Sequence, residues 1–269
     1  MKKNSGLTLI ELLIALVMSA IIIAALYQTF IGQQKTYTVQ EQVVDMQQNL
    51  RVGINKMMRE IRMAGFGNVS NVLSLAGGVN GFTEVITPNT DSITIVGGFK
   101  QIRANNGDPI LVASASGNTI TLNYQPKEDE FNTLAKRYIS IGGVESNTVK
   151  SISEKDLTLD NPLLQYHPAG TPLFKIQAIT YNLKDLVLGR DENTGGGPQP
   201  LADNIETLEL KYFDDQQPPI VTAIPENIRM IWVKVTASME DPDLKKARDG
   251  YRRRTITSSI QLRNMGLNQ

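Results

Sequence analysis

A membrane-length apolar segment that contains one carboxylate dominates the N-terminus of this chain. Residues 2–26 read KKNSGLTLIELLIALVMSAIIIAAL, and Glu11 is the only charged side chain from Leu7 to Leu26. About twenty apolar residues are enough for a helix to cross the bilayer core. A charge in such a helix costs roughly 2.5–3.5 kcal/mol on insertion scales, so an intramembrane acid is by default a functional residue that needs a partner. The segment itself supplies no cation.

Cleavage of the chain just before Leu7 would supply the missing cation. A cut between Gly6 and Leu7 creates a new α-amino group at the head of the apolar run, with a charge opposite to that of Glu11. In an apolar environment this ammonium can pair with Glu11 of a neighbouring copy. The segment therefore suggests a subunit that assembles into a filament.

Two simpler interpretations of this segment stay open. An ordinary secretory signal has an uncharged apolar core and an Ala-x-Ala-like site after it. Glu11 argues against the first feature, although Ala24 and Ala25 weakly imitate the second. A plain signal anchor, with Lys2 and Lys3 holding the N-terminus in the cytoplasm, explains the apolar run but leaves Glu11 unexplained.

The first residues resemble the class III leader of type IV pilins and of type II secretion pseudopilins. Two lysines precede Gly6, and the sequence LTLIE follows it. The resemblance implies that a prepilin peptidase cuts between Gly6 and Leu7 and that Leu7 becomes the N-methylated first residue. It also implies that Glu11 aligns incoming subunits during assembly. The family usually has Phe after the Gly, where this chain has Leu7.

The helix is predicted to continue far beyond the membrane. No proline occurs before Pro88, and charged residues such as Glu60 fall off the apolar stripe. Gly65 and Gly67 supply the stop. A helix from Leu7 to Ala64 would be on the order of 85 Å long, with its second half packed on a globular domain. The stripe has the spacing of an amphipathic helix: Val39, Val43, Met46, Leu50, Ile54, Met57, Ile61 and Ala64.

Three later stretches resemble PilW-type minor pilins. Residues 47–66 contain a QxNxR stretch followed by R-x-x-R-x-A-G and an aromatic residue. Residues 201–212, LADNIETLELKY, resemble the V/I-E-x-L-x-L-x-Y strand of that family, and residues 253–264, RRTITSSIQLRN, resemble its closing strand. The resemblance covers both ends of the chain and only thinly the middle.

Residues 68–269 are predicted to form one β-rich globular domain. Short runs with strand periodicity alternate with Gly, Asn, Asp and Pro clusters, which favours antiparallel sheets. One sheet must present an apolar face to the helix, and Trp232 is predicted to lie in the core. The predicted strands are Ser92–Val96, Ile110–Ala113, Thr119–Asn123, Tyr138–Ile141, Leu157–Leu159, Leu173–Tyr181, Ile205–Tyr212, Ile228–Ala237 and Thr255–Leu262.

Two polar segments of this domain are predicted to be loops. Residues 191–200 are rich in Gly, Asn, Asp and Pro, and their glycines lack the spacing of a phosphate-binding loop. Residues 240–254 are densely charged. This segment ends in three arginines, Arg252, Arg253 and Arg254. We predict that they form a solvated turn beside acidic residues and not a polyanion-binding patch.

The composition argues against catalysis, cofactors and metals. The chain has no Cys and one His, His167, whereas a His-centred metal site needs more ligands. Because His167 precedes Pro168, it is predicted to be a turn residue. A carboxylate pair for glycosidic chemistry stays open, since only its spatial separation would decide. The 27 basic and 27 acidic residues give no reason to expect nucleic acid as a main partner.

These features are best interpreted together as a minor pilin of a type IV pilus with an α+β fold. Residues 1–6 would form the cleaved leader and 7–67 the N-terminal helix, with 7–26 across the membrane and 27–65 amphipathic. Residues 68–269 would form the globular domain. The resemblance implies a non-enzymatic role in initiating pilus assembly, with a place in a tip complex as one option.

The same resemblance implies the partners and the compartment. The partners are the prepilin peptidase/methyltransferase, other minor and major pilins, and the inner-membrane assembly platform. The globular domain would lie in the periplasm while the helix is anchored in the inner membrane, and later on the pilus. A J-type pseudopilin of type II secretion is the alternative, and a membrane-anchored periplasmic enzyme is a remote one.

Overall fold

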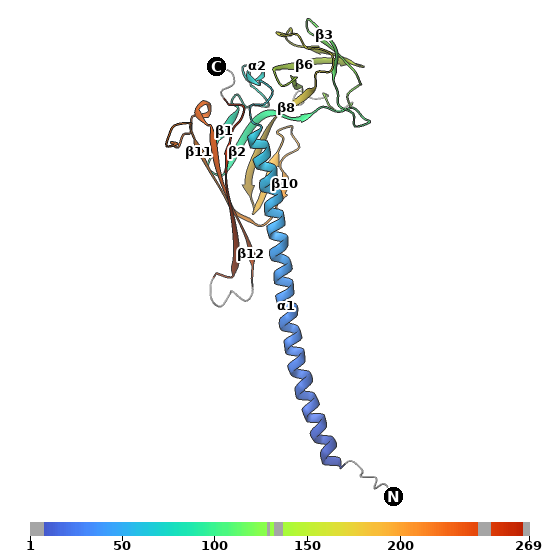
Figure 1. Cartoon of the computed structure of the whole chain (residues 1–269), viewed down its shortest axis with the longest axis vertical. Helices are drawn as coiled ribbons and strands as arrows, with labels where there is room; N and C mark the ends of the chain where they lie inside the picture. The colour runs from blue at the N-terminus through green and yellow to red at the C-terminus, as the bar shows by residue number, and fades with distance from the viewer. Residues whose placement is uncertain (1–7, 128–129, 132–136, 242–248, 266–269) are drawn as a thin grey trace.

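A long helix projects from a β-rich domain (Figure 1). The computed structural model describes residues 8–127, 130–131, 137–241 and 249–265. Helix α1 spans Leu9–Arg62, 54 residues, which corresponds to a length of about 80 Å. The predicted α+β architecture, a long apolar helix followed by antiparallel sheets, is confirmed.

Both ends of α1 follow from local sequence. Thr8 is the N-cap and Met63 the C-cap. Beyond the C-cap the chain turns through Gly65 and Gly67, whose φ angles of 76° and 102° lie in the left-handed region that glycine tolerates. The helix therefore ends within two residues of the predicted Ala64.

The second half of α1 docks on the domain along its apolar stripe. Five large side chains of the apolar stripe are at most 4% exposed. Val43 is partly buried and packs against the same core cluster. Val39 is half-buried and lies outside this core cluster. The core contacts of the stripe thus begin at Val43 and Met46, one to two turns after the predicted start of the docking face at Val39. The five buried side chains are Met46, Leu50, Ile54, Met57 and Ile61.

The larger sheet contains ten strands of different lengths. Its main order is β1-β2-β8-β5-β6-β7-β4-β3, and β9 pairs with both β8 and β10. Every pairing is antiparallel. The strands are β1 (Ile86–Pro88), β2 (Ser92–Gln101), β3 (Val112–Ser116), β4 (Thr119–Leu122), β5 (Tyr138–Ile141), β6 (Glu145–Ser153), β7 (Asp156–Leu159), β8 (Leu173–Lys184), β9 (Val187–Asp191) and β10 (Gln199–Ala202).

A separate three-stranded sheet has the order β11-β12-β13, formed by Ile205–Phe213, Met230–Glu240 and Tyr251–Gln261. The predicted alternation in β11 is confirmed, since its apolar side chains at alternate positions are at most 6% exposed. Trp232 was predicted to be core and is not. It is half-buried on β12, between the buried positions that face the core, and the Lys211 ammonium lies 5.2 Å from its ring centroid.

Two large hydrophobic clusters divide the domain. The first lies between α1 and both sheets, and the second is built mainly from β3 to β7. The second cluster belongs to the part of the ten-stranded sheet that is formed by the segment between β2 and β8 (Figure 1). The strands that pack against the helix therefore come from the two ends of the globular sequence.

Four strands were not predicted: β1, β6, β9 and β10. The predicted loop at residues 191–200 is shorter than expected, because β9 extends to Asp191 and β10 begins at Gln199. In the charged segment 240–254, which was predicted to be a loop, residues 242–248 lie outside the described residues, and β13 already begins at Tyr251. A short helix α2 (Ser70–Leu73) and a 3₁₀ turn η2 (Pro225–Asn227) complete the described elements.

The two glycines within α1 are expected to respond in opposite ways to alanine. By helix propensity alone each weakens the helix by about 1 kcal/mol relative to Ala. At Gly53, however, a Cβ would lie 2.9 Å from the Cβ of Ala202, whereas at Gly32 nothing lies within 4 Å. Gly53→Ala should therefore lower the free energy of unfolding by about 1–2 kcal/mol, as overpacking does.

Denaturant unfolding of the two variants measures this difference. Gly32→Ala is the matched control and should leave the unfolding midpoint of the domain unchanged or slightly raised. A stabilised Gly53→Ala variant would mean that α1 does not approach β10 as closely as the structure places it.

Candidate assembly site on the N-terminal helix

The apolar half of α1 is fully exposed in the isolated chain. Its most apolar 18-residue window has a mean hydropathy of 2.8, and none of that window is buried. Leu9, Leu16 and Ile23 are 83%, 64% and 65% exposed. A stable water-soluble protein does not expose such a surface, so this half of the helix requires lipid or the helices of neighbouring subunits.

Glu11 lies at the N-terminal end of this apolar surface and caps its own helix. Its Oε2 accepts hydrogen bonds from the Thr8 backbone N–H at 2.9 Å and from Thr8 Oγ1 at 2.8 Å. In return the Glu11 N–H donates to Thr8 Oγ1 at 3.4 Å. This reciprocal arrangement is a capping box, which satisfies two of the free donors at the helix start.

The capping box fixes the position of the Glu11 carboxylate at the start of the helix. It holds Glu11 at the positive end of the helix dipole, beside the backbone N–H of Thr8. The predicted cleavage residues Gly6 and Leu7 precede Thr8 directly and lie outside the described residues. Thr8 was missed as a site residue, although the pattern Thr-x-x-Glu before an apolar run is a readable capping signature.

Comparison with known families identifies this region. Residues 1–27 match the prokaryotic N-terminal methylation motif. The motif indicates a type IV pilin or pseudopilin. It covers the leader and the apolar start of α1 and leaves the globular domain unmatched. No curated protein and no solved structure matches the chain.

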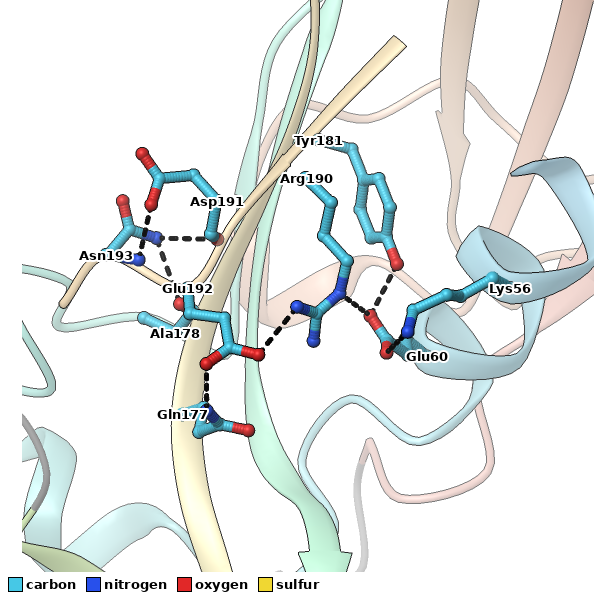
Figure 2. Close-up of polar contacts among 9 residues, drawn as sticks. All are labelled: Lys56, Glu60, Gln177, Ala178, Tyr181, Arg190, Asp191, Glu192 and Asn193. Atoms are coloured by element: carbon cyan, nitrogen blue, oxygen red, sulfur yellow. Dashed lines mark hydrogen bonds and ion pairs between the residues drawn. The ribbon is translucent and has the colours of Figure 1, made fainter. Parts of the chain in front are cut away.

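A polar cluster near the C-terminal end of α1 connects the helix to the ten-stranded sheet (Figure 2). Glu60 accepts a hydrogen bond from Arg190 Nε at 2.9 Å and a short one from the Tyr181 hydroxyl. Lys56 approaches the other Glu60 oxygen at 3.9 Å. The side chains of Glu60 and Arg190 are only 14% and 11% exposed.

The cluster continues into the sheet. Arg190 Nη1 donates to Glu192 at 2.7 Å, and the Gln177 amide donates to the same carboxylate at 3.0 Å. Burial raises the pKa of the Tyr181 phenol well above its ordinary value, and the charge of Glu60 raises it further. Both effects favour the protonated phenol, which donates the hydrogen bond to Glu60.

Glu60 was predicted to fall off the docking stripe, and no pattern in the sequence indicated this cluster. The residue is off the stripe but not free in solvent, because β8 and β9 wrap beside the helix and supply Tyr181 and Arg190. No local pattern reveals such a contact, since the partners are more than a hundred residues away in sequence. A paired, hydrogen-bonded charge fixes the rotation of the helix against the sheet.

A second tyrosine joins the two sheets. The Tyr212 hydroxyl of β11 donates to the Asn89 carbonyl at 2.7 Å and accepts from the Asn89 N–H at 3.0 Å. Burial raises the pKa of Tyr212 to about 12. The turn between β1 and β2 is thereby tied to the three-stranded sheet.

The single histidine has a structural environment. His167 is 3% exposed, and its Nε2 lies 2.9 Å from Glu145 Oε2. Glu145 also accepts the backbone N–H groups of Leu164 and Gln165 at 2.8 and 3.2 Å. His167 was predicted to be a turn residue, and it lies instead in a segment without regular secondary structure, where it is buried. Through Glu145 it helps to hold the segment around Leu164 and Gln165. Within the part of the chain that the structure describes, no group of three His, Asp or Glu residues could hold a metal ion.

Proposed function

We propose that this chain is a minor pilin of the PilW type that enters a type IV pilus, or its priming complex, through its N-terminal helix. The observation that carries the proposal is the exposed apolar half of α1 with Glu11 at its start. The methylation motif of residues 1–27 supports a pilin or pseudopilin. The resemblance of residues 47–66, 201–212 and 253–264 to PilW-type proteins supports the finer assignment.

The proposed topology follows from the same features. Residues 1–6 act as the leader, residues 7–26 span the inner membrane, and residues 68–269 lie in the periplasm until assembly. Lys2 and Lys3 favour a cytoplasmic N-terminus before processing. The prepilin peptidase/methyltransferase, other pilins and the inner-membrane assembly platform are the proposed partners.

The proposed chemistry at the site is charge pairing between subunits. Removal of residues 1–6 gives Leu7 an ammonium group, which becomes N-methylated. In an apolar filament core this ammonium of one subunit pairs with Glu11 of the next. An unpaired charge there is costly, so pairing favours the assembled state.

A J-type pseudopilin of type II secretion is the second candidate, because the matched motif is shared by both classes. A strain that lacks this chain separates the two. Loss of surface pili with unchanged protein secretion supports the minor pilin, and the reverse result supports the pseudopilin. Complementation with the wild-type chain must restore the affected phenotype.

Processing itself is tested at the Gly6–Leu7 junction. Gly6→Val should abolish cleavage, because a branched side chain must enter a peptidase site that in this family accepts Gly. Intact-mass measurement of the wild-type protein should show loss of residues 1–6 and addition of one methyl group. An uncut wild-type chain, or one that starts after Ala25, would contradict the pilin interpretation.

A further inference from the structure

Strand β13 is an edge strand of the three-stranded sheet, and no strand of the described chain pairs with its outer side. It pairs with β12 on one side only, over eleven residues from Tyr251 to Gln261. Nine of its side chains up to Ser259 are exposed or half-buried, and Ile260 alone is buried. The hairpin of β12 and β13 runs alongside α1 (Figure 1).

The register determines which backbone groups of β13 are free. Leu262 N–H donates to the Arg229 carbonyl, and Asp241 N–H donates to the Gly250 carbonyl. In an antiparallel ladder hydrogen-bonded residues alternate, so the even-numbered residues of β13 bond to β12. The odd-numbered residues direct N–H and C=O to the open edge: Arg253, Thr255, Thr257, Ser259 and Gln261. Tyr251 shares this orientation, but its N–H donates to Asp249 Oδ1 at 3.2 Å.

The second half of this edge lacks the usual protection against pairing. Natural edge strands are blunted by charged side chains, proline, bulges or short length. The first half of β13 carries three arginines, Arg252 to Arg254, whereas the second half, Thr255–Gln261, has neither a charged side chain nor a proline. The register with β12 runs without a shift. An uncharged edge segment of seven residues is a template for strand addition.

The side chains on the core face of the edge define what could pair with it. Ile256 and Ile260 share this face with the buried positions of β12. Toward the start of the strand, Arg252 and Arg254 line an open cavity of about 400 Å³, together with Asp249 and with Val43 and Met46 of α1. Arg252 pairs with Asp241, whereas Arg254 has no ion-pair partner within the described residues.

We propose that β13 accepts an extended, antiparallel strand from a neighbouring subunit. The antiparallel sense continues the ladder of the existing sheet, and it is slightly more stable per residue than a parallel one. The added strand places apolar side chains beside Ile260 and Ile256 and a carboxylate beside Arg254. Its other side chains alternate outward, next to the hydroxyl groups of Thr257 and Ser259.

The position of β13 beside α1 identifies the source of this strand. A subunit whose helix packs along α1 brings its own globular domain next to the hairpin, so the two contacts form one continuous interface. The choice of a neighbouring subunit rests on the proposed function. The ability of the edge to take up a strand of this pattern does not, and it is measured separately.

A synthetic peptide tests the edge directly. The probe is fluorescently labelled Gly-Thr-Val-Thr-Ala-Thr-Ile-Thr-Glu-Gly, titrated against the full-length protein in detergent. We expect binding, and we expect the free amides of Arg253, Thr255, Thr257 and Ser259 to gain protection from hydrogen exchange. No binding, or binding without protection of these amides, would overturn the proposal.

Variants at one position separate backbone from side chain. Thr257→Pro removes an outward N–H without touching the ladder to β12, and it should weaken peptide binding at least about fivefold, the factor expected for one main-chain hydrogen bond. Thr257→Val keeps the N–H and should bind as the wild type does. Equal binding by all three proteins would exclude pairing at this edge.

A charge swap keeps the test valid if Thr257→Pro does not fold. Arg254→Glu should weaken binding of the peptide, and replacing the peptide's Glu by Lys should restore it. Absence of this reciprocity would overturn the assigned register. These results are independent of filament incorporation, so they distinguish failure of this proposal from failure of the proposed function.

Discussion

Glu11→Val is expected to remove this chain from assembled filaments while its synthesis and membrane insertion stay intact. Valine suits the apolar segment, so the helix still inserts and the variant still accumulates in the membrane. In the filament, however, the ammonium of a neighbouring subunit would lose its partner in an apolar environment, a loss of roughly 3–5 kcal/mol. The amount of this subunit in sheared filaments, divided by its amount in the membrane, should fall about tenfold or more. Quantitative immunoblotting measures this ratio.

Matched variants separate the charge of Glu11 from its capping role. Thr8→Ala removes the Oγ1 that bonds Glu11 but keeps the carboxylate, so it should weaken the helix start by about 1 kcal/mol and reduce incorporation little. Glu11→Asp should act partly, because the shorter side chain keeps the charge. Glu41→Ala should have little effect, since Glu41 is exposed on the far part of α1.

The outcome of these variants decides between two roles for one side chain. If Thr8→Ala and Glu11→Val reduce incorporation equally, the capping box and not the charge is what assembly requires. If the Val variant enters filaments undiminished, Glu11 does not direct assembly in this protein.

The helix was predictable from sequence because its determinants are local. Apolar spacing, the absence of proline and the glycines after Ala64 place α1 within two residues of its observed ends. The start of the docking face was not predictable to the same degree. It depends on how far the hairpin of β12 and β13 extends along the helix, and this distance is set by strand pairing between distant segments.

The polar contacts of the domain were likewise not predictable from the sequence. Glu60 has the sequence context of an exposed helical acid, yet it pairs with Tyr181 and Arg190, which are brought to it by β8 and β9. Trp232 has the context of a core residue and instead lies beside Lys211. In both cases the surroundings of the side chain depend on how distant segments pack together, which composition and periodicity do not determine.

The arginine triplet illustrates how register changes an interpretation. As sequence, Arg252, Arg253 and Arg254 suggest a solvated turn. As part of β13, alternate members point to opposite faces: Arg253 forms ion pairs with Glu206 and Asp249, and Arg252 pairs with the buried Asp241. The prediction of a turn was therefore wrong, because the strand begins earlier than its β-branched residues indicate.

Deleting α1 is expected to have the largest effect on stability. Five large side chains of the helix are almost fully buried against the sheets, and at roughly 1.5–3 kcal/mol each they contribute roughly 8–15 kcal/mol. This equals the whole stability of a typical domain. A chain that starts at Gln28 should be soluble and rich in β-structure by circular dichroism, whereas one that starts at Asn68 should expose the apolar sheet face and aggregate.

Single substitutions in the Gln28 chain test the same contact without a deletion. Leu50 is 1% exposed and Val52 is 63% exposed, although the two residues lie within one turn of the same helix. Leu50→Asp should lower the free energy of unfolding by more than about 4 kcal/mol, because it buries an unpaired charge in the core. Val52→Asp adds the same charge at the surface and should change it by less than about 0.5 kcal/mol. Equal stability of these two variants, or equal solubility of the two truncated chains, would mean that α1 does not complete the core of the domain.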